Sequence, residues 1–310
     1  MTQMDTPMKW MNPPMKQMKL LMKLMGLALM LGACTTARDD ASPASDTTAA
    51  ATDAAAIAPG AEGAAAQLAG STRHGEWASI PVAGGDSVRA WVVYPERPDP
   101  APVVVVIHEI FGLTTWVRSV ADQLAAEGYI AIAPDLLSGH SMPMAPDSFM
   151  AAEGGIDSAI AMVSRLDQDQ VMRRIGAVGE WGVALPAAAD KWGVVGFCWG
   201  GTTVLAYAAH SGGGADAVVS YYGGIQQDQA DMSRTTVPTL ALYGGDDARV
   251  NSTRSYVEES FRAAGVAFES ETYEGAGHGF LRQQTGQDGD NARAAAAAWP
   301  RMLRWFERYL

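Results

Sequence analysis

The feature that most constrains the fold of this chain is an unbroken run of apolar, mostly β-branched residues in PVVVVIHE, at positions 102–109. A run without polar alternation suits a strand that is buried on both faces of a sheet. The segment SVADQLAAEG follows with helical spacing and ends at Gly128, and YIAIAP reads as the next strand. Strands and helices then alternate to the C-terminus, which predicts an α/β fold with a mostly parallel sheet and helices on both faces.

Two shorter segments precede this alternation, EWASIPV and SVRAWVVYP, and the turn sequence AGGD separates them. We expect an N-terminal antiparallel hairpin there. Ligands of parallel α/β sheets bind beyond the carboxyl ends of the strands. At that edge we expect Glu109, Cys198, the segment YGGDD and the loop after Glu274 to meet.

The N-terminus has the pattern of a secretory signal over residues 1–33, a basic stretch followed by the apolar run LMGLALMLGA. The run ends in Leu-Gly-Ala before Cys34 and resembles a bacterial lipobox, which implies lipidation of Cys34; the alternative is an ordinary signal peptide with a chance cysteine. We therefore expect an exported lipoprotein, anchored in a membrane on its periplasmic or cell-surface side. Residues 34–71 are poor in large apolar residues and are expected to be a disordered linker before a domain over 72–310.

The segment GFCWG places Cys198 between an apolar strand and a helix-like run. Gly-x-nucleophile-x-Gly in that context is the pattern of a nucleophile elbow, in which Gly196 and Gly200 allow a very tight turn. The following helix points its N-terminus at the thiol and favours the thiolate. The alternative is a small buried cysteine beside a glycine-rich turn.

A cysteine nucleophile needs a base and an acid that orients the base, in the chain order nucleophile, acid, histidine. His278, in the glycine-rich segment YEGAGHGFLR, is the candidate base. Asp246 and Asp247 follow a strand, and either could orient His278, while acids at such places also serve as turn residues or helix caps.

The backbone N–H groups of Trp199 and Ile110 are the candidate donors to an oxyanion. Glu109 puts a carboxylate close to the thiol, and its alternative interpretation is a solvated acid at a strand end. The segment HEIFG lacks the second histidine of a zinc protease motif, and we expect neither a metal nor an organic cofactor. A formal net charge of −12 argues against nucleic acid as a partner.

The motifs HEIFG, GFCWGG, YYGG, GGDD and GAGHGFLR, in that order, resemble the dienelactone hydrolase family, a branch of the α/β-hydrolase fold. The resemblance implies a Cys198–Asp247–His278 triad and a glutamate, Glu109, that gates activation of the thiol. It also implies that Arg282 helps to hold a substrate carboxylate, and that Tyr222 belongs to an aromatic pair near the pocket.

We therefore expect a hydrolase that cleaves a small-molecule ester or lactone through an acyl-enzyme, similar to a carboxymethylenebutenolidase. Three alternatives stay open. The same residues could serve a thioesterase or acyltransferase, the chain could be a non-catalytic surface-tethered module, or Cys198 could be a redox-sensing thiol.

Overall fold

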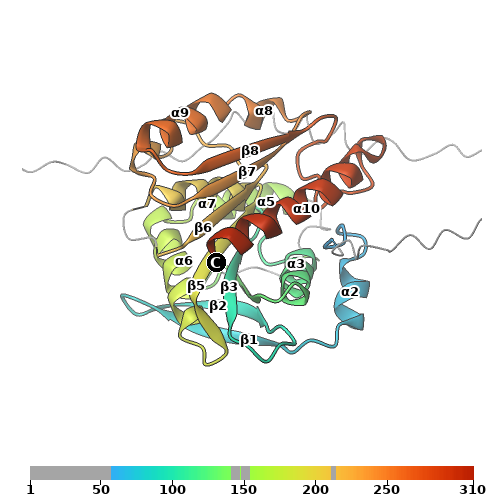
Figure 1. Cartoon of the computed structure of the whole chain (residues 1–310), viewed down its shortest axis with the longest axis vertical. Helices are drawn as coiled ribbons and strands as arrows, with labels where there is room; N and C mark the ends of the chain where they lie inside the picture. The colour runs from blue at the N-terminus through green and yellow to red at the C-terminus, as the bar shows by residue number, and fades with distance from the viewer. Residues whose placement is uncertain (1–56, 141–146, 148–153, 211–213) are drawn as a thin grey trace, which may run out of the picture.

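The computed structural model describes residues 57–140, 147, 154–210 and 214–310 (Figure 1). The expected signal segment over residues 1–33 and the expected lipidation site Cys34 lie outside these residues. Among the helices in the described part of the chain, none has the length and apolar character needed to cross a membrane.

One eight-stranded sheet forms the centre of the domain, in the order β1-β2-β4-β3-β5-β6-β7-β8. β2 pairs antiparallel with β1 and with β4, and every other neighbouring pair is parallel. This arrangement confirms the predicted α/β-hydrolase fold with an N-terminal hairpin. The strands are β1 (Gly75–Val82), β2 (Asp86–Val93), β3 (Ala101–Ile107), β4 (Ile130–Pro134), β5 (Ala188–Phe197), β6 (Ala217–Tyr221), β7 (Thr239–Gly244) and β8 (Phe268–Tyr273).

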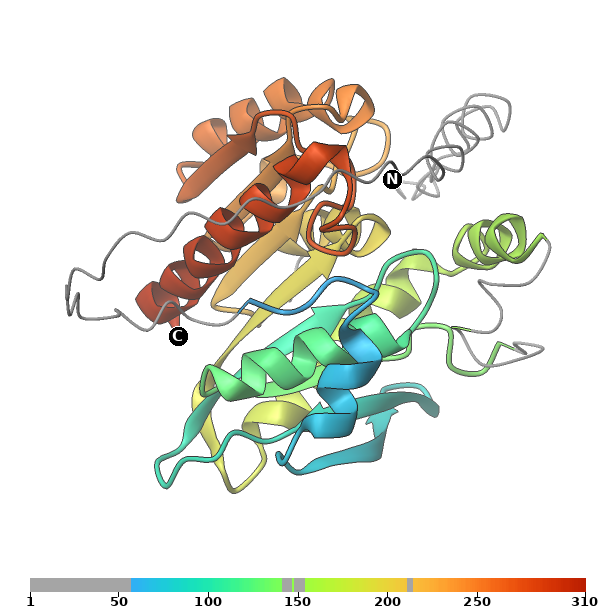
Figure 2. The same cartoon turned by 90° about the vertical axis from the view of Figure 1, so that its right-hand side faces the viewer.

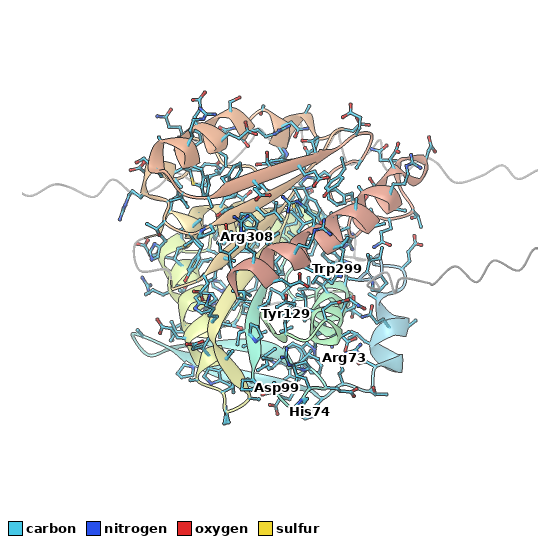
Figure 3. All side chains as sticks on the ribbon, in the orientation of Figure 1. Arg73, His74, Asp99, Tyr129, Trp299 and Arg308 are labelled. Atoms are coloured by element: carbon cyan, nitrogen blue, oxygen red, sulfur yellow. The ribbon has the colours of Figure 1, made fainter. Side chains whose placement is uncertain are left out.

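Helices cover both faces of the sheet (Figures 1 and 2). Side chains of α3 and α10 share a core with one face, and side chains of α6, α7 and α9 share a core with the other. Trp299, labelled in Figure 3, is fully buried in the first of these cores. The helices are α2 (Ala64–Gly70), α3 (Thr115–Ala126), α5 (Gly155–Val163), α6 (Gln168–Val183), α7 (Trp199–Ala208), α8 (Ala248–Asn251), α9 (Arg254–Ala264) and α10 (Asp290–Tyr309).

The apolar run of β3 is what a strand needs when helices pack on both faces of the sheet. Val104 and Val106 point into the core beneath α3 and α10, whereas Val103 and Val105 point into the core beneath α6 and α7. All four side chains are fully buried. Successive side chains of a strand point to opposite faces, so a strand in the middle of a two-sided core needs apolar residues at every position.

Residues 57–71 differ from the expected linker over residues 34–71. Ala58 and Ala64 are buried in the core that contains Trp116, and α2 packs on α3 (Figure 2). The folded part of the chain therefore begins by residue 57 and not at residue 72. Small alanine side chains can bury completely against a large aromatic ring, although they produce little hydrophobic periodicity in the sequence.

The carboxyl ends of the parallel strands β3, β5, β7 and β8 lie along one edge of the sheet. The residues that follow these ends are His108, Cys198, Gly245 and Glu274. Four loops that are distant in the sequence therefore meet at this edge, which is where parallel α/β sheets place their ligand sites.

Candidate active site

Cys198 occupies a strained turn between β5 and α7. Its backbone has φ 57° and ψ −112°, a conformation that residues with a side chain rarely adopt. A Cβ on Gly196 would collide with the carbonyl oxygen of Gly200, and a Cβ on Gly200 would lie 2.5 Å from the carbonyl oxygens of Ile107 and His108. Both glycines are thus required by the close approach of backbone atoms, as the elbow pattern predicts.

The thiol of Cys198 is half-buried at the N-terminus of α7. Its own backbone N–H donates to the carbonyl oxygen of Tyr221 at 3.1 Å, which fixes the elbow to the end of β6. The indole ring of the next residue, Trp199, stacks on His108 with 5.5 Å between ring centres. The sulfur therefore lies at the positive end of a helix, in a turn held from two sides.

The structure brings His278 and Asp247 together. The Nδ1 atom of His278 lies 2.5 Å from Oδ2 of Asp247, and Oδ1 of Asp247 accepts the backbone N–H of Val250 at 3.2 Å. Asp247 is buried, whereas Asp246 is exposed and contributes its backbone N–H to the carbonyl oxygen of Ala276. Of the two acids that the sequence left open, the one bonded to His278 is Asp247.

The protonation of His278 is set by its neighbours. Burial lowers the pKa of His278, but the adjoining Cys198 sulfur and the Asp247 carboxylate outweigh burial and raise that pKa to about 10. Burial likewise opposes the charge of Asp247, yet the hydrogen bond from His278 holds the pKa of Asp247 below its usual value. The imidazolium form of His278 is thus favoured between two acidic groups.

Glu109 is buried and faces Arg282. Burial raises the pKa of Glu109 to about 7, while the positive charges of Arg282 and His278 pull it down. The Nε atom of Arg282 lies 3.2 Å from Oε2 of Glu109, but neither atom makes a hydrogen bond of good geometry within the described residues. The alternative interpretation of Glu109 as a solvated strand-end acid is wrong, because the residue is only 3% exposed.

Tyr222 completes the wall beside the thiol. Its ring packs edge-on against His278 with 5.2 Å between ring centres, and the side chain is fully buried. Its hydroxyl has no hydrogen-bonding partner among the described residues. Burial raises the pKa of Tyr222 well above its usual value, and the charges of Glu109 and Cys198 add to that rise.

His108 has a structural role next to this site. Its Nε2 atom accepts the backbone N–H of Leu136 at 3.1 Å, and its Nδ1 atom lies 2.6 Å from the carbonyl oxygen of Glu109. Burial lowers the pKa of His108, so the ring is neutral with its proton on Nδ1. Within the described residues, no group of three or more His, Cys, Asp or Glu side chains could hold a metal ion.

The two candidate oxyanion donors come from the elbow itself and from the loop after β3. Trp199 is the first residue of α7, so its N–H has no acceptor within the helix. Ile110 follows Glu109 in the loop after β3, and within the described residues its N–H has no backbone or side-chain acceptor. Both groups are therefore available to a ligand.

Sequence reasoning missed Arg249. This exposed residue of α8 has its Nη2 atom 3.5 Å from Nδ1 of His278, and its charge helps to lower the pKa of Asp247. The only available signal was its position two residues after Asp247, and no motif marked it.

Residues 88–310 match the model of the dienelactone hydrolase family. A carboxymethylenebutenolidase of Pseudomonas putida is 32% identical over 206 residues, 66% of this chain and 84% of the relative. A candidate carboxymethylenebutenolidase of Escherichia coli K12 is 31% identical over 242 residues, 74% of this chain and 86% of the relative. The crystal structure of a candidate dienelactone hydrolase of Klebsiella pneumoniae, 28% identical, superposes with a TM-score of 0.66 and covers 77% of this chain and 100% of its own. The chain belongs to the dienelactone hydrolase family and is a hydrolase of carboxylic esters or lactones.

Proposed function

We propose that this hydrolase cleaves a small-molecule ester or lactone with a Cys198–His278–Asp247 triad, through a covalent acyl-enzyme. The observation that carries the proposal is the position of the His278 ring, which bonds to Asp247 through Nδ1 and is close enough to the Cys198 side chain to interact with it directly. An imidazole between a thiol and a buried carboxylate is the arrangement that activates a cysteine nucleophile.

In the first half of the reaction, the sulfur of Cys198 forms a bond to the substrate carbonyl carbon, and the carbonyl π electrons move onto oxygen. The N–H groups of Trp199 and Ile110 donate to this oxyanion. When the oxyanion collapses, the bond to the leaving oxygen breaks, and that oxygen takes the proton that His278 holds. For a lactone the leaving hydroxyl stays attached to the acyl group.

In the second half, a water molecule attacks the thioester carbon while His278 accepts one of its protons. Collapse of the second oxyanion breaks the carbon–sulfur bond and releases the carboxylic acid. The thiolate of Cys198 and the imidazolium of His278 are then restored. Asp247 stays ionised throughout, because its task is to hold the ring and to balance its charge.

Glu109, Arg282 and Tyr222 are proposed to face the bound substrate. Oε2 of Glu109, Nε of Arg282 and the hydroxyl of Tyr222 are buried and lack hydrogen-bonding partners among the described residues. A substrate carboxylate near Arg282 would compete with Glu109 for the guanidinium and so couple binding to the environment of the thiol.

The proposal also includes export and lipidation at Cys34, which rest on the N-terminal sequence alone.

The test compares Cys198→Ala and Asp247→Asn with the matched control Asp246→Asn on a panel of oxygen esters, lactones and thioesters. We expect Cys198→Ala and Asp247→Asn to lower kcat by about 1,000-fold or more, and the control to stay within about twofold of wild type. Intact-mass measurement during turnover should detect an acyl adduct on Cys198. Full activity of Cys198→Ala would disprove the mechanism, and preference for thioesters would favour the thioesterase alternative.

A further inference from the structure

Two loops from distant strands carry the groups around the thiol. Glu109 lies in the loop after β3, and His278 and Arg282 lie in the loop after β8. In the sheet, β3 and β8 are separated by β5, β6 and β7. The two loops are therefore not carried by neighbouring strands, yet Nε of Arg282 lies 3.2 Å from Oε2 of Glu109.

We name residues 57–71 the brace. The brace contacts the loop after β8 at the backbone of Arg282 and at the side chain of Gln284. The N–H of Ala61 donates to the carbonyl oxygen of Arg282 at 2.8 Å, and Nε2 of Gln284 donates to the carbonyl oxygen of Ala58 at 2.8 Å. A Cβ on Gly60 would lie 3.1 Å from that same oxygen of Arg282. The brace thus lies directly against the backbone of Arg282.

The brace is also fixed to α3, which begins soon after the loop that carries Glu109. The indole Nε1 of Trp116 donates to the carbonyl oxygen of Pro59 at 3.1 Å. Further along, Nε2 of Gln67 and the hydroxyl of Ser71 donate to the buried carboxylate of Asp122 at 3.1 and 2.5 Å. Arg73, labelled in Figure 3, pairs with the same carboxylate just past the end of the brace.

We propose that the brace is a positioning element of the active site, which sets the separation of the Glu109 and Arg282 loops from outside. The proposal rests on the function proposed above. The brace connects the loop of Arg282 with α3, the helix that follows the loop of Glu109, and it lies before residue 88, where the family match begins. Hydrolysis by this chain therefore depends on a segment outside the region that it shares with the family.

The brace can act on the reaction because the site tolerates little displacement. A shift of about 1 Å in a positioning group can cost an enzyme about 100-fold in rate. Arg282, His278 and Tyr222 are the charged or titratable neighbours whose interactions with Glu109 are resolved, and Arg282 has the largest effect among the charges. Loosening the brace should move Arg282 away from Glu109 and weaken that effect.

The test uses the full chain with the double variant Gln67→Met, Gln284→Met, which removes the bond from Gln67 to Asp122 and the bond from Gln284 to Ala58 without changing side-chain length. The matched control is Gln283→Met, at the neighbouring position, whose side chain makes no hydrogen bond to the brace among the described residues. We expect kcat/KM of the double variant to fall about tenfold, and the control to stay within about twofold. The limb of the pH profile that belongs to Glu109 should move to higher pH, because its pKa rises when Arg282 recedes.

Hydrogen exchange at the amides of residues 279–286 gives a readout that does not depend on catalysis. We expect faster exchange there in the double variant than in wild type or in the control. Unchanged exchange and activity would overturn the proposal, as would a loss of activity that only follows the folded fraction with an unchanged pH profile. If Cys198→Ala stays active, the proposed function fails, and the exchange measurement still decides the role of the brace.

Discussion

Burial of Glu109 should make the stability of this enzyme fall as the pH rises, and Glu109→Gln should remove that fall. The pKa of Glu109 rises from an ordinary 4.5 to about 7 in the folded protein. Between these values the folded state binds more protons than the unfolded state, so the free energy of unfolding decreases with pH. Between pH 5 and pH 8 the decrease from this one group integrates to about 2.5 kcal/mol.

Urea denaturation at pH 5, 6, 7 and 8 measures this effect in wild type and in Glu109→Gln. The substitution also changes stability by a constant amount, which cancels when the slopes against pH are compared. The variant should lose about 2.5 kcal/mol less than wild type between pH 5 and pH 8. Glu274→Gln, at an exposed glutamate, controls for the removal of one negative charge. Parallel curves for wild type and Glu109→Gln would refute the argument that burial outweighs the Arg282 charge.

Two further substitutions test the geometry of the elbow and its wall. Gly196→Ala should destabilise the protein by more than about 3 kcal/mol and lower the yield of folded enzyme, because the new methyl group collides with the carbonyl oxygen of Gly200. Thermal unfolding followed by circular dichroism measures this effect. An unchanged melting temperature would contradict the elbow geometry. Tyr222→Phe removes a buried hydroxyl that has no partner among the described residues, so the free energy of unfolding should stay within about 1 kcal/mol of wild type or rise. We expect KM to increase, because the hydroxyl is proposed to face the substrate. A drop in stability with unchanged KM would contradict both points.

The sheet could be predicted from the sequence because its signals are local and strong. The run of Val103–Val106 needs no partner to be recognised as a strand with two buried faces. The glycine pattern around Cys198 is equally local as a signal, although only Gly196 is required by its own turn and Gly200 is required by the distant backbone of Ile107 and His108. Where a residue's task is decided within a few positions of it, the sequence pattern was sufficient.

The remaining features depend on contacts between distant segments. Asp246 and Asp247 both follow β7, and only the direction of each side chain at the start of α8 makes Asp247 the partner of His278. Glu109 is buried beside Arg282, a residue from the last part of the sequence, and no pattern near Glu109 indicates that neighbour. The brace was missed because it is held by backbone carbonyls and small side chains, which leave no periodic signal.

The unfavourable contributions to folding stability are concentrated at the edge of the sheet where these distant segments meet. Cys198 is held in a strained backbone conformation, which costs about 1–3 kcal/mol. Each buried polar atom without a partner, on Glu109, Arg282 and Tyr222, costs a similar amount. These unfavourable terms belong to residues around the Cys198 sulfur, while the apolar cores on both faces stabilise the strands from which those residues extend. A substrate that supplies the missing polar partners would therefore recover free energy on binding, and a substrate without them would not. We therefore expect the substrate that fits this site best to carry polar or anionic groups next to the carbonyl that Cys198 attacks in the proposed mechanism.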